Sequence, residues 1–540
     1  MAQSQPFGVS ARGGLNTNLN QLEMLSQPGF ATRLTNFEVD ADGGYRRING
    51  YVPFGGDDAV SPTGGTVSPI TGVHVYGDGV IATAANDIYF SNDGITWIQL
   101  NKASVASGGD NYSTFNSRSE LTLSDCGVYE FSTYEGITDH GEVFMTDKSG
   151  NNKPFWFKMT GTGDLDTRTF YAAQLTISSS TAAKFNTLHD GHFVAAGDPT
   201  TPDVIYYSGT NDPTDFSSSG SGSIRLEDKI VGMKTFRDDM IIFCENSLFK
   251  LANINNSSTI DVTPITKNVG CMDGRSIQEI GGDLVFLSPD GIRTVAGTAR
   301  IGDVELGSVS RQIQSVISGI AAEIDNVIIS SGVIRNKSQY RLFYAAAGQS
   351  QSSSKGIIGT FTPNGFEWSE TEGIQAHGYA TSFDSDGIEK AFHGDSTGFV
   401  YVHNSGNFFS NKLVATNIIA HYNTPDFDMG DAGTRKTMQY VKISFTPEGQ
   451  VDPLLRVRYD YEDINQPQPD QYSLSQIPAP AVFGSSEFND ATFGGLSDPL
   501  VRQAIQGSGH TVSFKISSND QNPPYAVNGF YVDYVPAGRR

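Results

Sequence analysis

The chain is poor in cysteine, in basic residues and in long hydrophobic runs, and each shortage excludes a class of protein. Its three cysteines, Cys126, Cys244 and Cys271, form no CxxC pair, so neither a disulfide framework nor a zinc site is indicated. No run of about 18 uncharged apolar residues occurs, and the N-terminal segment has no apolar core of signal-peptide length. The sequence therefore predicts a soluble chain that is not exported through the Sec pathway, has no membrane-spanning segment and keeps its thiols buried.

Positive charge is scarce as well. The 36 lysines and arginines are outnumbered by 59 aspartates and glutamates, which gives a formal net charge of −23. Proteins that grip nucleic acids rely on cationic side chains that displace phosphate counterions, so this chain is not expected to hold DNA tightly. An acidic surface would still let a duplex slide past, because it offers a polyanion no place to bind.

The sequence also lacks the motifs of common active sites. It contains no GxSxG, no GxxxxGK[ST], no post-strand GxGxxG and no HExxH. His189 and His192 lie close together without a third ligand. Acidic loops at residues 40–42 and 384–386 and at Asp290 invite a calcium interpretation, yet none completes the D-x-[DN]-x-[DN]-G pattern with a distal glutamate. We therefore predict no catalytic residue, no cofactor and no metal ion, with calcium in an acidic loop as the alternative.

What the sequence does contain is a repeat. With 59 glycines and 23 prolines it is rich in chain reversals, and short apolar strands recur between them. Each unit is a polar turn, a strand, a Gly/Asp/Ser/Asn reversal and a second strand. Seven such units begin at Gly77, His140, Asp190, Asp238, Gly282, Asn336 and Gly387, 44 to 63 residues apart.

This spacing is close to the ~40 to 50 residue period of propeller blades. One such hairpin cannot bury its apolar face alone, so the units must stack radially. The predicted fold class is all-β: a β-propeller of six to eight blades, with seven favoured, over residues 61–425, followed by an antiparallel β-sandwich over residues 426–540. Residues 1–60 form an N-terminal arm that contributes strands to the other domains. The alternative is one or two large β-sandwiches, whose strands recur every 8 to 12 residues.

Three short segments carry local predictions. The stretch SNDGITW, from Ser91 to Trp97, resembles the Asp-box hairpin of sialidase-like propellers, in which Asp93 folds back on the turn amides and Trp97 packs between sheets. In VFLSPDGIRTV, residues 285–295, Asp-Gly supplies the geometry of a tight turn, so Asp290 is predicted to be a corner between strands. Residues 310–324 show helical spacing of apolar residues, with Ser310 as the expected cap.

The N-terminal stretch GGLNTNLNQLEMLSQPGFATRLTNFEVDADGGYRRINGY resembles the opening of a family of virion proteins of tailed bacteriophages. In that family a GGL start leads to a segment that corresponds here to Asn36 to Tyr51. Further similar pieces are IIFCENSLFKL, LVFLSPDGIRTV, GDSTGFVY and the closing FYVDYVPAGRR, all in the family's order. The chain is similar to the nozzle (tail tubular) and packaged-DNA stabilisation proteins of short-tailed phages.

This resemblance implies a structural protein without enzymatic activity, located in the virion after assembly in the host cytoplasm. It implies a homo-oligomeric ring of six copies below the adaptor of the head-tail connector, next to tail fibre or tip proteins. Genomic DNA would pass through the lumen without sequence-specific binding. In so acidic a chain, we expect the pairs Arg46-Arg47 and Arg539-Arg540 to make intersubunit or adaptor salt bridges, with ordinary solvated arginines as the alternative.

The sequence is also compatible with two rival functions. A glycan-binding or glycan-cleaving propeller of sialidase type would hold sugar with the aromatic-rich loops around Trp97, Trp156 or Trp368. A receptor-binding or baseplate protein would share the virion location and present an adhesive outer surface.

Overall fold

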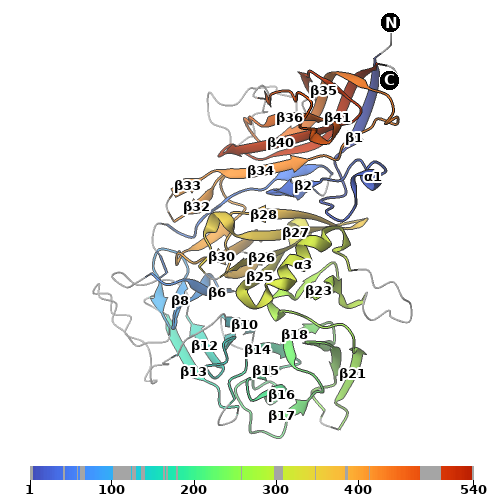
Figure 1. Ribbon diagram of the computed structural model, residues 1–540. Coiled ribbons are helices and arrows are strands. Elements are labelled where there is room, and N and C mark those ends of the chain that lie inside the picture. The colour runs from blue at the N-terminus through green and yellow to red at the C-terminus, as the bar shows by residue number, and fades with distance from the viewer. Residues whose placement is uncertain are drawn as a thin grey trace.

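The computed structural model describes residues 4–40, 43–56, 59–60, 67–100, 123, 129–135, 140–161, 165, 168–177, 181–256, 258–296, 308–346, 348–383, 387–412, 414–474 and 500–537. Two parts follow each other along the long dimension of the molecule in Figure 1. A ring of sheets occupies the lower part, and a smaller β-domain that holds both chain ends occupies the upper part. Nearly all regular structure in the described residues is strand.

Sheets surround a common axis in the lower part. Among the described residues, six of these sheets have four strands or more and a seventh has three. Their first strands contact one another in sequence order around the ring, and the last of them contacts the first. Between the fourth and fifth sheets, this contact is made by the 3-10 turn Gly274–Ser276. The predicted β-propeller is confirmed, with a blade count inside the predicted range of six to eight.

The first four sheets are regular four-stranded meanders. They comprise β6 (Ile70–Tyr76), β7 (Gly79–Ala84), β8 (Asp87–Ser91) and β9 (Ile98–Gln99); β10 (Tyr129–Tyr134), β11 (Glu142–Asp147), β12 (Phe155–Thr160) and β13 (Thr169–Gln174); β14 (Phe185–His189), β15 (His192–Asp198), β16 (Thr201–Tyr207) and β17 (Gly222–Arg225); and β18 (Ile230–Phe236), β19 (Asp239–Cys244), β20 (Leu248–Ala252) and β21 (Asp261–Thr266).

The remaining blades are less regular. They comprise β22 (Gln278–Ile280), β23 (Asp283–Ser288) and β24 (Gly291–Thr294); β25 (Val327–Ile334), β26 (Gln339–Ala346), β27 (Lys355–Thr362) and β28 (Gly365–Glu372); and β29 (Gly378–Phe383), β30 (Glu389–Gly394) and β31 (Val400–His403), which are extended by β5 (Tyr51–Pro53), β32 (Phe409–Asn411) and β33 (Val414–Thr416).

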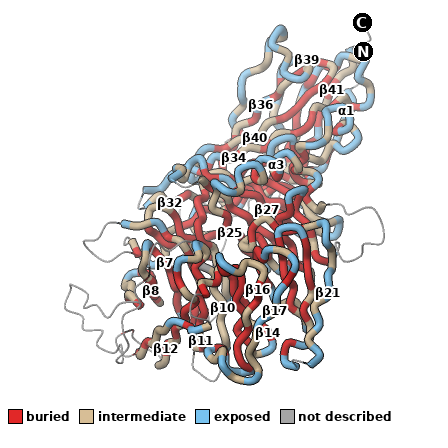
Figure 2. Tube along the Cα trace, turned by 60° about the horizontal axis from the view of Figure 1, so that its bottom comes forward, coloured by how far each residue is buried: buried red, intermediate tan, exposed pale blue. Residues whose placement is uncertain are grey.

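Five of the seven repeat units are hairpins formed by the middle strands of blades. In the described residues the unit at Gly282 is β23 with the edge strand β24, and the unit at Asn336 is β26 with the turn before it. Middle strands are covered by a neighbouring blade on each face, so both sides are apolar and the strand reads as a continuous hydrophobic run. Every residue of β7 and of β15 is buried, and Figure 2 shows buried chain throughout the ring. The repeat seen in the sequence therefore corresponds to the buried strands at the centre of successive blades.

The N-terminal arm closes the ring. Strand β5 pairs with β31, with Val52 opposite Val402, so the last blade combines strands from both ends of the propeller segment. A blade shared in this way ties the ring shut, because opening it would break strand pairing as well as packing between blades. Other strands of the arm lie in sheets of the upper domain.

The upper domain is a sandwich of two sheets. One sheet contains β1 (Gln5–Ser10), β3 (Phe37–Val39), β4 (Tyr45–Arg47), β35 (Lys436–Pro447), β38 (Leu500–Ala504), β39 (Ser508–Gly509) and β41 (Tyr525–Pro536). The other contains β2 (Arg33–Thr35), β34 (Ile418–Asn423), β36 (Leu454–Tyr459), β37 (Tyr472–Ser473) and β40 (Val512–Asp520). Phe514 of β40 stacks on Phe530 of β41, with ring centroids 5.3 Å apart, which places the core between the two sheets. The predicted boundary at residue 425 falls just after β34.

Helices are few and short in the described chain. The helix predicted over residues 310–324 is present as α3 (Gln314–Ala322), preceded by the 3-10 turn Arg311–Ile313, and it buries Ile317 and Ile320. The predicted cap is wrong: the Ser310 hydroxyl makes no capping hydrogen bond and instead accepts one from the Ile292 amide, 2.8 Å away. The other helical pieces are α1 (Gln21–Met24) and the 3-10 turns Ile324–Asn326, Arg335–Lys337, Gln351–Ser353 and Asp460–Glu462. None of the described helices is long and apolar enough to cross a bilayer.

Both turn predictions are confirmed. In the Asp-box hairpin, Asp93 accepts hydrogen bonds from the amides of Ile95 and Thr96 at 2.8 and 2.9 Å, and the Trp97 ring packs against Phe54. At the other turn, Ser288 pairs with Gly291 across a tight corner, where Asp290 accepts a hydrogen bond from the Arg293 guanidinium. Asp290 is therefore a structural corner.

Candidate functional site

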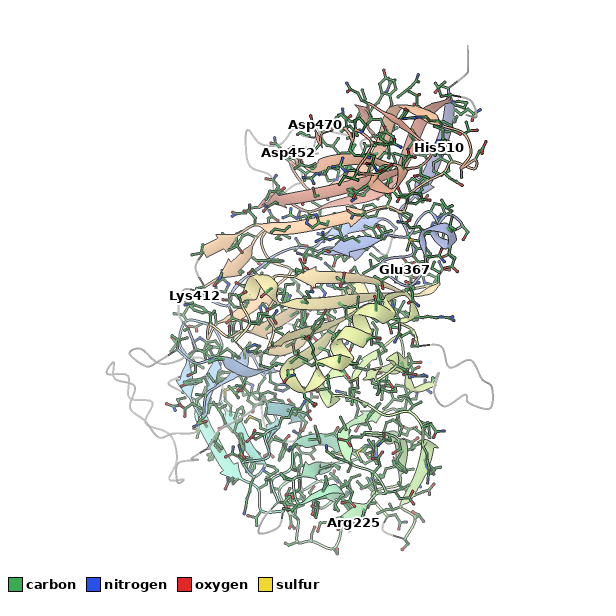
Figure 3. All side chains as sticks on the ribbon, in the orientation of Figure 1. Arg225, Glu367, Lys412, Asp452, Asp470 and His510 are labelled. Carbon is green, nitrogen blue, oxygen red and sulfur yellow. The ribbon has the colours of Figure 1, made fainter. Side chains whose placement is uncertain are left out.

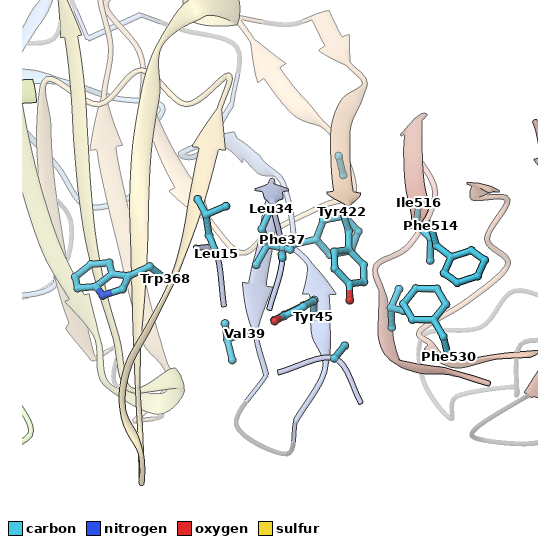
Figure 4. Close-up of a cluster of buried hydrophobic side chains, with 14 of the residues drawn as sticks. Leu15, Leu34, Phe37, Val39, Tyr45, Trp368, Tyr422, Phe514, Ile516 and Phe530 are labelled. Carbon is cyan, nitrogen blue, oxygen red and sulfur yellow. The ribbon is translucent and has the colours of Figure 1, made fainter. Parts of the chain in front are cut away.

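The N-terminal arm forms the joint between the two parts of the molecule. Strand β2 pairs with β28 of the sixth blade on one side and with β34 of the upper domain on the other, so one nine-stranded sheet runs through both parts. Figure 4 shows apolar side chains filling this joint, from Trp368 of the blade through the arm to Phe530 of the sandwich. Trp368 is fully buried, and its indole nitrogen donates to the carbonyl oxygen of Val309.

The GGL start of the arm crosses the blade at close range. Gly14 has a φ of +77°, and a Cβ placed on it would lie 2.7 Å from the Trp368 amide nitrogen. The Leu15 amide donates to the Trp368 carbonyl at 2.7 Å, and the Leu15 side chain is fully buried. Beside it, the Gly13 amide donates to the carboxylate of Glu367, which Figure 3 places at the edge of the joint. Glycine is needed at Gly14 because any side chain would collide with the blade backbone.

A buried carboxylate anchors the arm to the propeller. Glu38 of β3 is 2% exposed and accepts from Lys337 at 2.7 Å, Arg341 at 3.0 Å and Arg46 at 2.8 Å. Burial alone would raise the pKa of Glu38, but the charges of Lys337, Arg341 and Arg46 outweigh it and lower the pKa to about 2. The cluster joins the arm to β26 and to the turn before it.

The two predicted interface arginines within the described residues both have internal partners. Arg46 also forms a bidentate pair with Glu448 of the upper domain. Arg47 is fully buried and donates to the carbonyl oxygens of Asn522 and Asp520, at 2.6 and 3.1 Å. Contacts of these arginines with another subunit stay a prediction. Arg539 and Arg540 lie outside the described residues.

A second candidate site is the cavity on the propeller axis, which has a volume of about 580 Å³. All seven first strands or their flanking turns line it. Neighbouring first strands run in the same direction, because His74 bonds to Thr133 and Thr235 bonds to the Leu188 carbonyl at matching positions. The starts of the strands therefore gather at one end of the cavity and their ends at the other.

An ion pair crosses the axis at the end where the strands start. Lys148, in the turn after β11, reaches Asp273, which precedes the fifth sheet, at 2.6 Å. Arg275 adds a second pair with Asp273 at 3.1 Å. Burial raises the pKa of Asp273, but Arg275 and Lys148 outweigh burial and hold the pKa well below its usual range. The cavity is thus bridged at one end by charged side chains.

Four charged side chains line the cavity: Glu130, Lys234, Arg275 and Arg335. Burial is the main cause that raises the pKa of Glu130, to about 7, and its Oε1 is buried without a hydrogen-bond partner among the described residues. Lys234 also lines the cavity, where its side chain is exposed to solvent. Burial, with a contribution from Lys234, lowers the pKa of His74 to about 4.

Two of the serines that line the cavity donate their hydroxyls to backbone carbonyls. The hydroxyl of Ser330 is engaged by the Ala376 carbonyl at 2.7 Å, and that of Ser331 by the Arg275 carbonyl. The sequence around Glu130 and Lys234 does not mark them as cavity residues. A charged residue within an apolar strand has the same sequence context whether its side chain faces the propeller axis or the outer solvent. Only the ring arrangement assigns such residues to one site.

The residues considered for metal binding have other roles where they are described. The His192 ring bonds to the Ser208 carbonyl and to the Asn255 side chain. No group of three or more His, Cys, Asp or Glu side chains suited to a metal ion occurs among the described residues. Of the acidic loops, residues 41–42 and 384–386 lie outside the described chain, as does Cys126. Cys244 and Cys271 are free and buried.

The tryptophans proposed to hold sugar do not form a common surface. Trp368 belongs to the joint, and Trp97 donates to the Gly94 carbonyl within its own turn at 3.1 Å. Trp156 stacks on Phe144 in the second blade.

No family model matches the chain, and no curated protein matches it. Among solved structures, the computationally designed protein Ika8 is 11% identical, with 64% of this chain and 99% of that chain covered and a TM-score of 0.31. The WD40 domain of Neurospora crassa Pan2 is 6% identical, with coverages of 66% and 94% and a TM-score of 0.36. An exo-β-1,3-galactanase from Phanerochaete chrysosporium is 9% identical, with coverages of 89% and 100% and a TM-score of 0.24. Similarities this low carry no weight, so the propeller assignment rests on strand pairing.

Proposed function

We propose that this protein is a structural component of the tail of a short-tailed bacteriophage, a nozzle subunit that forms a ring below the adaptor. In this role it lines the DNA channel, helps to retain the packaged genome and conducts the DNA during ejection, without enzymatic activity. The observation that carries the proposal concerns the segment that resembles virion proteins. Its residues Gly14, Glu38 and Arg47 are those that build the joint between the propeller and the sandwich.

A rigid joint suits a ring subunit. Strand β2 makes the blade and the sandwich parts of one sheet, and Glu38 adds a buried ionic anchor beside it. A load applied to the sandwich would therefore pass to the propeller through backbone hydrogen bonds and not through a flexible linker. Subunits of a channel that holds a pressurised genome need this stiffness.

The DNA path would run between copies and not through one propeller. The axial cavity is about 580 Å³ and is bridged by the Lys148–Asp273 pair, so it has no room for a duplex. A ring of copies would instead surround a lumen with acidic walls, given the formal net charge of −23. Such walls repel phosphate and leave the duplex free to slide.

The oligomeric state tests this proposal. We expect purified protein, alone or with its adaptor, to elute in light-scattering chromatography as a ring of about six copies. Negative-stain images of that fraction should show a central lumen. A protein that stays monomeric with the adaptor, and that cleaves or retains polysaccharide, would instead favour the glycan-active alternative.

The position within the virion needs a second experiment. Particles whose gene for this protein carries a C-terminal tag should bind a gold-labelled antibody at the tail, close to the head. Label confined to the distal tip or to fibres would favour a receptor-binding or baseplate protein.

A further inference from the structure

One face of the upper domain is cationic, although the chain as a whole is acidic. Strands β2, β34, β40 and β36 lie side by side, and one side of each is buried in the core. The register places Arg33 opposite Asn423, which in turn lies opposite Lys515. Lys515 lies opposite Arg456. Residues opposite each other in neighbouring strands share a face, so these three cations form one row on the outer side of the sheet.

No acidic residue interrupts the outer face of these four strands. Among the residues that alternate with the buried ones, none is aspartate or glutamate, and four are cationic: Arg33, Arg456, Arg458 and Lys515. Acidic residues outnumber basic ones by 59 to 36 in the whole chain, so the face departs from the overall composition. His421 also lies on it, and burial, followed by the charges of Arg33 and Arg456, lowers the pKa of His421, so its ring is neutral near pH 7.

The two arginines at the ends of the row keep their full charge. Arg33 and Arg456 are both exposed. Arg33 donates from Nε to the Thr35 hydroxyl at 3.4 Å, and Arg456 donates from Nη2 to Oε1 of Gln471 at 3.1 Å. These acceptors are neutral, and within the described chain neither arginine forms an ion pair. Both guanidinium groups are therefore available to an anion.

The carboxylates near the face offset only part of its charge. Lys515 and Arg458 share one partner, the carboxylate of Glu462. Glu370 and Glu372 belong to β28, the strand beyond β2, and border the face on the side of the propeller. Four cations against one paired carboxylate leave the outer face of the four strands positive.

The composition of the face suits a phosphate backbone. Proteins bind phosphate oxygens with Arg and Lys and with Ser, Thr and Asn, and these residue types make up most of the face. A protein partner would need an apolar centre, whereas the outer side of these strands offers only Ile419 and Leu454 as large apolar residues. Arg33 and Arg456 are three strands apart, about 14 Å at ~4.8 Å per strand. This spacing is close to the ~12 Å width of the major groove of DNA.

We infer that this cationic face binds the phosphate backbone of duplex DNA, with Arg33 and Arg456 contacting phosphates on the two sides of a groove. Contacts of this kind do not depend on base sequence, and they are weak here because the rest of the chain repels phosphate. The inference rests on the proposed tail function for the source of the DNA. It adds a restraint to that function: acidic walls let the duplex slide, and a ring of such faces slows it while the genome is retained.

Fluorescence anisotropy of a labelled DNA duplex, titrated with the full chain, tests the inference. We expect the parent to bind at about 50 mM salt and to lose affinity steeply toward about 200 mM, as phosphate contacts do. The double variant Arg33→Gln/Arg456→Gln should bind about 10-fold more weakly at the lower salt, and its slope of log affinity against log salt should be shallower by about 2. No binding by the parent at 50 mM salt, or equal binding by parent and variant, would overturn the inference.

The matched control is Arg225→Gln/Lys267→Gln, which changes the net charge by the same amount. Both residues are exposed on the propeller, where they pair with Asp203 and Glu227, and Figure 3 places Arg225 at the end far from the upper domain. This control should bind DNA like the parent. Both double variants should melt close to the parent temperature, because exposed charges contribute little to stability. An equal loss of affinity in the control would show that net charge, and not this face, governs binding.

Light-scattering chromatography of the same proteins separates this inference from the tail proposal. Rings formed by parent and Arg33→Gln/Arg456→Gln alike, with DNA binding weakened only in the variant, would support both. A monomeric parent whose DNA binding needs the two arginines would contradict the tail proposal and keep the inference. If the variant lost its rings but bound DNA like the parent, the face would belong to contacts between copies and the inference would be wrong.

Discussion

The Lys148 ammonium lies 2.6 Å from the Asp273 carboxylate, and the pair joins the second blade to the fifth across the propeller axis. The extensive strand contacts in the described part of the ring link adjacent blades, whereas this ion pair joins two blades that are not adjacent. The pair therefore acts as a crossbar at one end of the cavity. Its side chains are only 23% and 10% exposed, so its loss leaves Asp273 largely desolvated with Arg275 as its remaining partner.

Replacing Lys148 with methionine should destabilise the protein by about 2 kcal/mol, less than the ~3 to 5 kcal/mol of a fully buried pair because Lys148 keeps some solvent contact. Urea unfolding followed by circular dichroism measures the change. Lys267→Met removes one partner of an exposed pair and should cost less than about 1 kcal/mol. Equal effects of the two variants would contradict the crossbar role.

Glu38 pairs with three cations at the joint, so its loss should lower the free energy of unfolding more than the loss of Lys148 does. Glu38→Gln keeps the shape of the side chain but leaves Lys337, Arg341 and Arg46 without their shared anion, and we expect a loss of about 3 kcal/mol in urea unfolding. Glu448→Gln is the matched control, because Glu448 pairs with Arg46 from an exposed position. A smaller loss for Glu38→Gln than for Glu448→Gln would argue against the anchor.

The stability that the Glu38 anchor contributes should decrease in acid. The pKa of Glu38 is about 2 in the folded protein, below its ordinary value of 4.5. The unfolded chain therefore takes up the proton first, and the stability contributed by Glu38 is complete above about pH 4.5 and lost as the pH falls toward 2. Unfolding free energies of the parent and Glu38→Gln, measured from pH 6 to pH 3, should converge toward the acid end. Parallel curves would show that Glu38 titrates normally.

The period of the fold was predictable because it is written in local sequence. Blade hairpins such as β7–β8 and β19–β20 are buried on both faces, so each leaves an apolar run bounded by turn residues. The Asp-box was predictable for the same reason, since Asp93 bonds to amides only two and three residues away. Features that depend on neighbours within a few residues leave a readable pattern.

The joint and the cavity depend on distant neighbours and left no such pattern. Glu38 has the sequence context of an ordinary strand residue, and its partners Lys337 and Arg341 lie in the sixth blade. Lys234 alternates with apolar residues as a solvated strand residue would, yet it faces the axis. The predicted Ser310 cap was wrong for the same reason. The Ser310 hydroxyl accepts a hydrogen bond from the Ile292 amide, which belongs to another element.

The Asp-box hairpin gives a local test of fold stability. Asp93→Ala removes the acceptor for the Ile95 and Thr96 amides and should cost about 1 kcal/mol in urea unfolding. Asp93→Asn keeps a side-chain oxygen in the same place and should retain most of that stability. A loss in the asparagine variant as large as in the alanine variant would mean that the negative charge, and not the turn geometry, is what matters.

The last blade encloses a cluster of histidines that should make the protein acid-sensitive. His393 and His403 lie with ring centroids 4.4 Å apart, packed on Tyr51, and both nitrogens of His393 lack hydrogen-bond partners among the described residues. Burial first, and then His377, lower the pKa of His393 to about 3. The pKa of His403 is lowered by burial, by His393 and by the nearby Arg341 cation.

These histidines are therefore neutral in the folded protein at pH values where the unfolded chain is protonated. Each contributes no pH dependence above its ordinary pKa of 6.5, and costs stability as the pH falls below it, by up to about 1.4 kcal/mol per pH unit. Asp395 contacts Tyr401, and among the described residues no carboxylate contacts the His393 or His403 imidazole to relieve this cost. We expect the parent to lose about 1.6 kcal/mol per buried histidine between pH 6.5 and pH 5.

His393→Phe should remove its share of that loss. Phenylalanine preserves an aromatic ring beside Tyr51 and Tyr401 and cannot be protonated, so the variant's urea stability should fall less steeply from pH 6.5 to pH 5. His510→Phe is the matched control, because His510 lies in the upper domain, away from the cluster (Figure 3), and it should keep the parent's slope. If both variants kept the parent's slope, the histidine cluster would not be the source of the acid sensitivity.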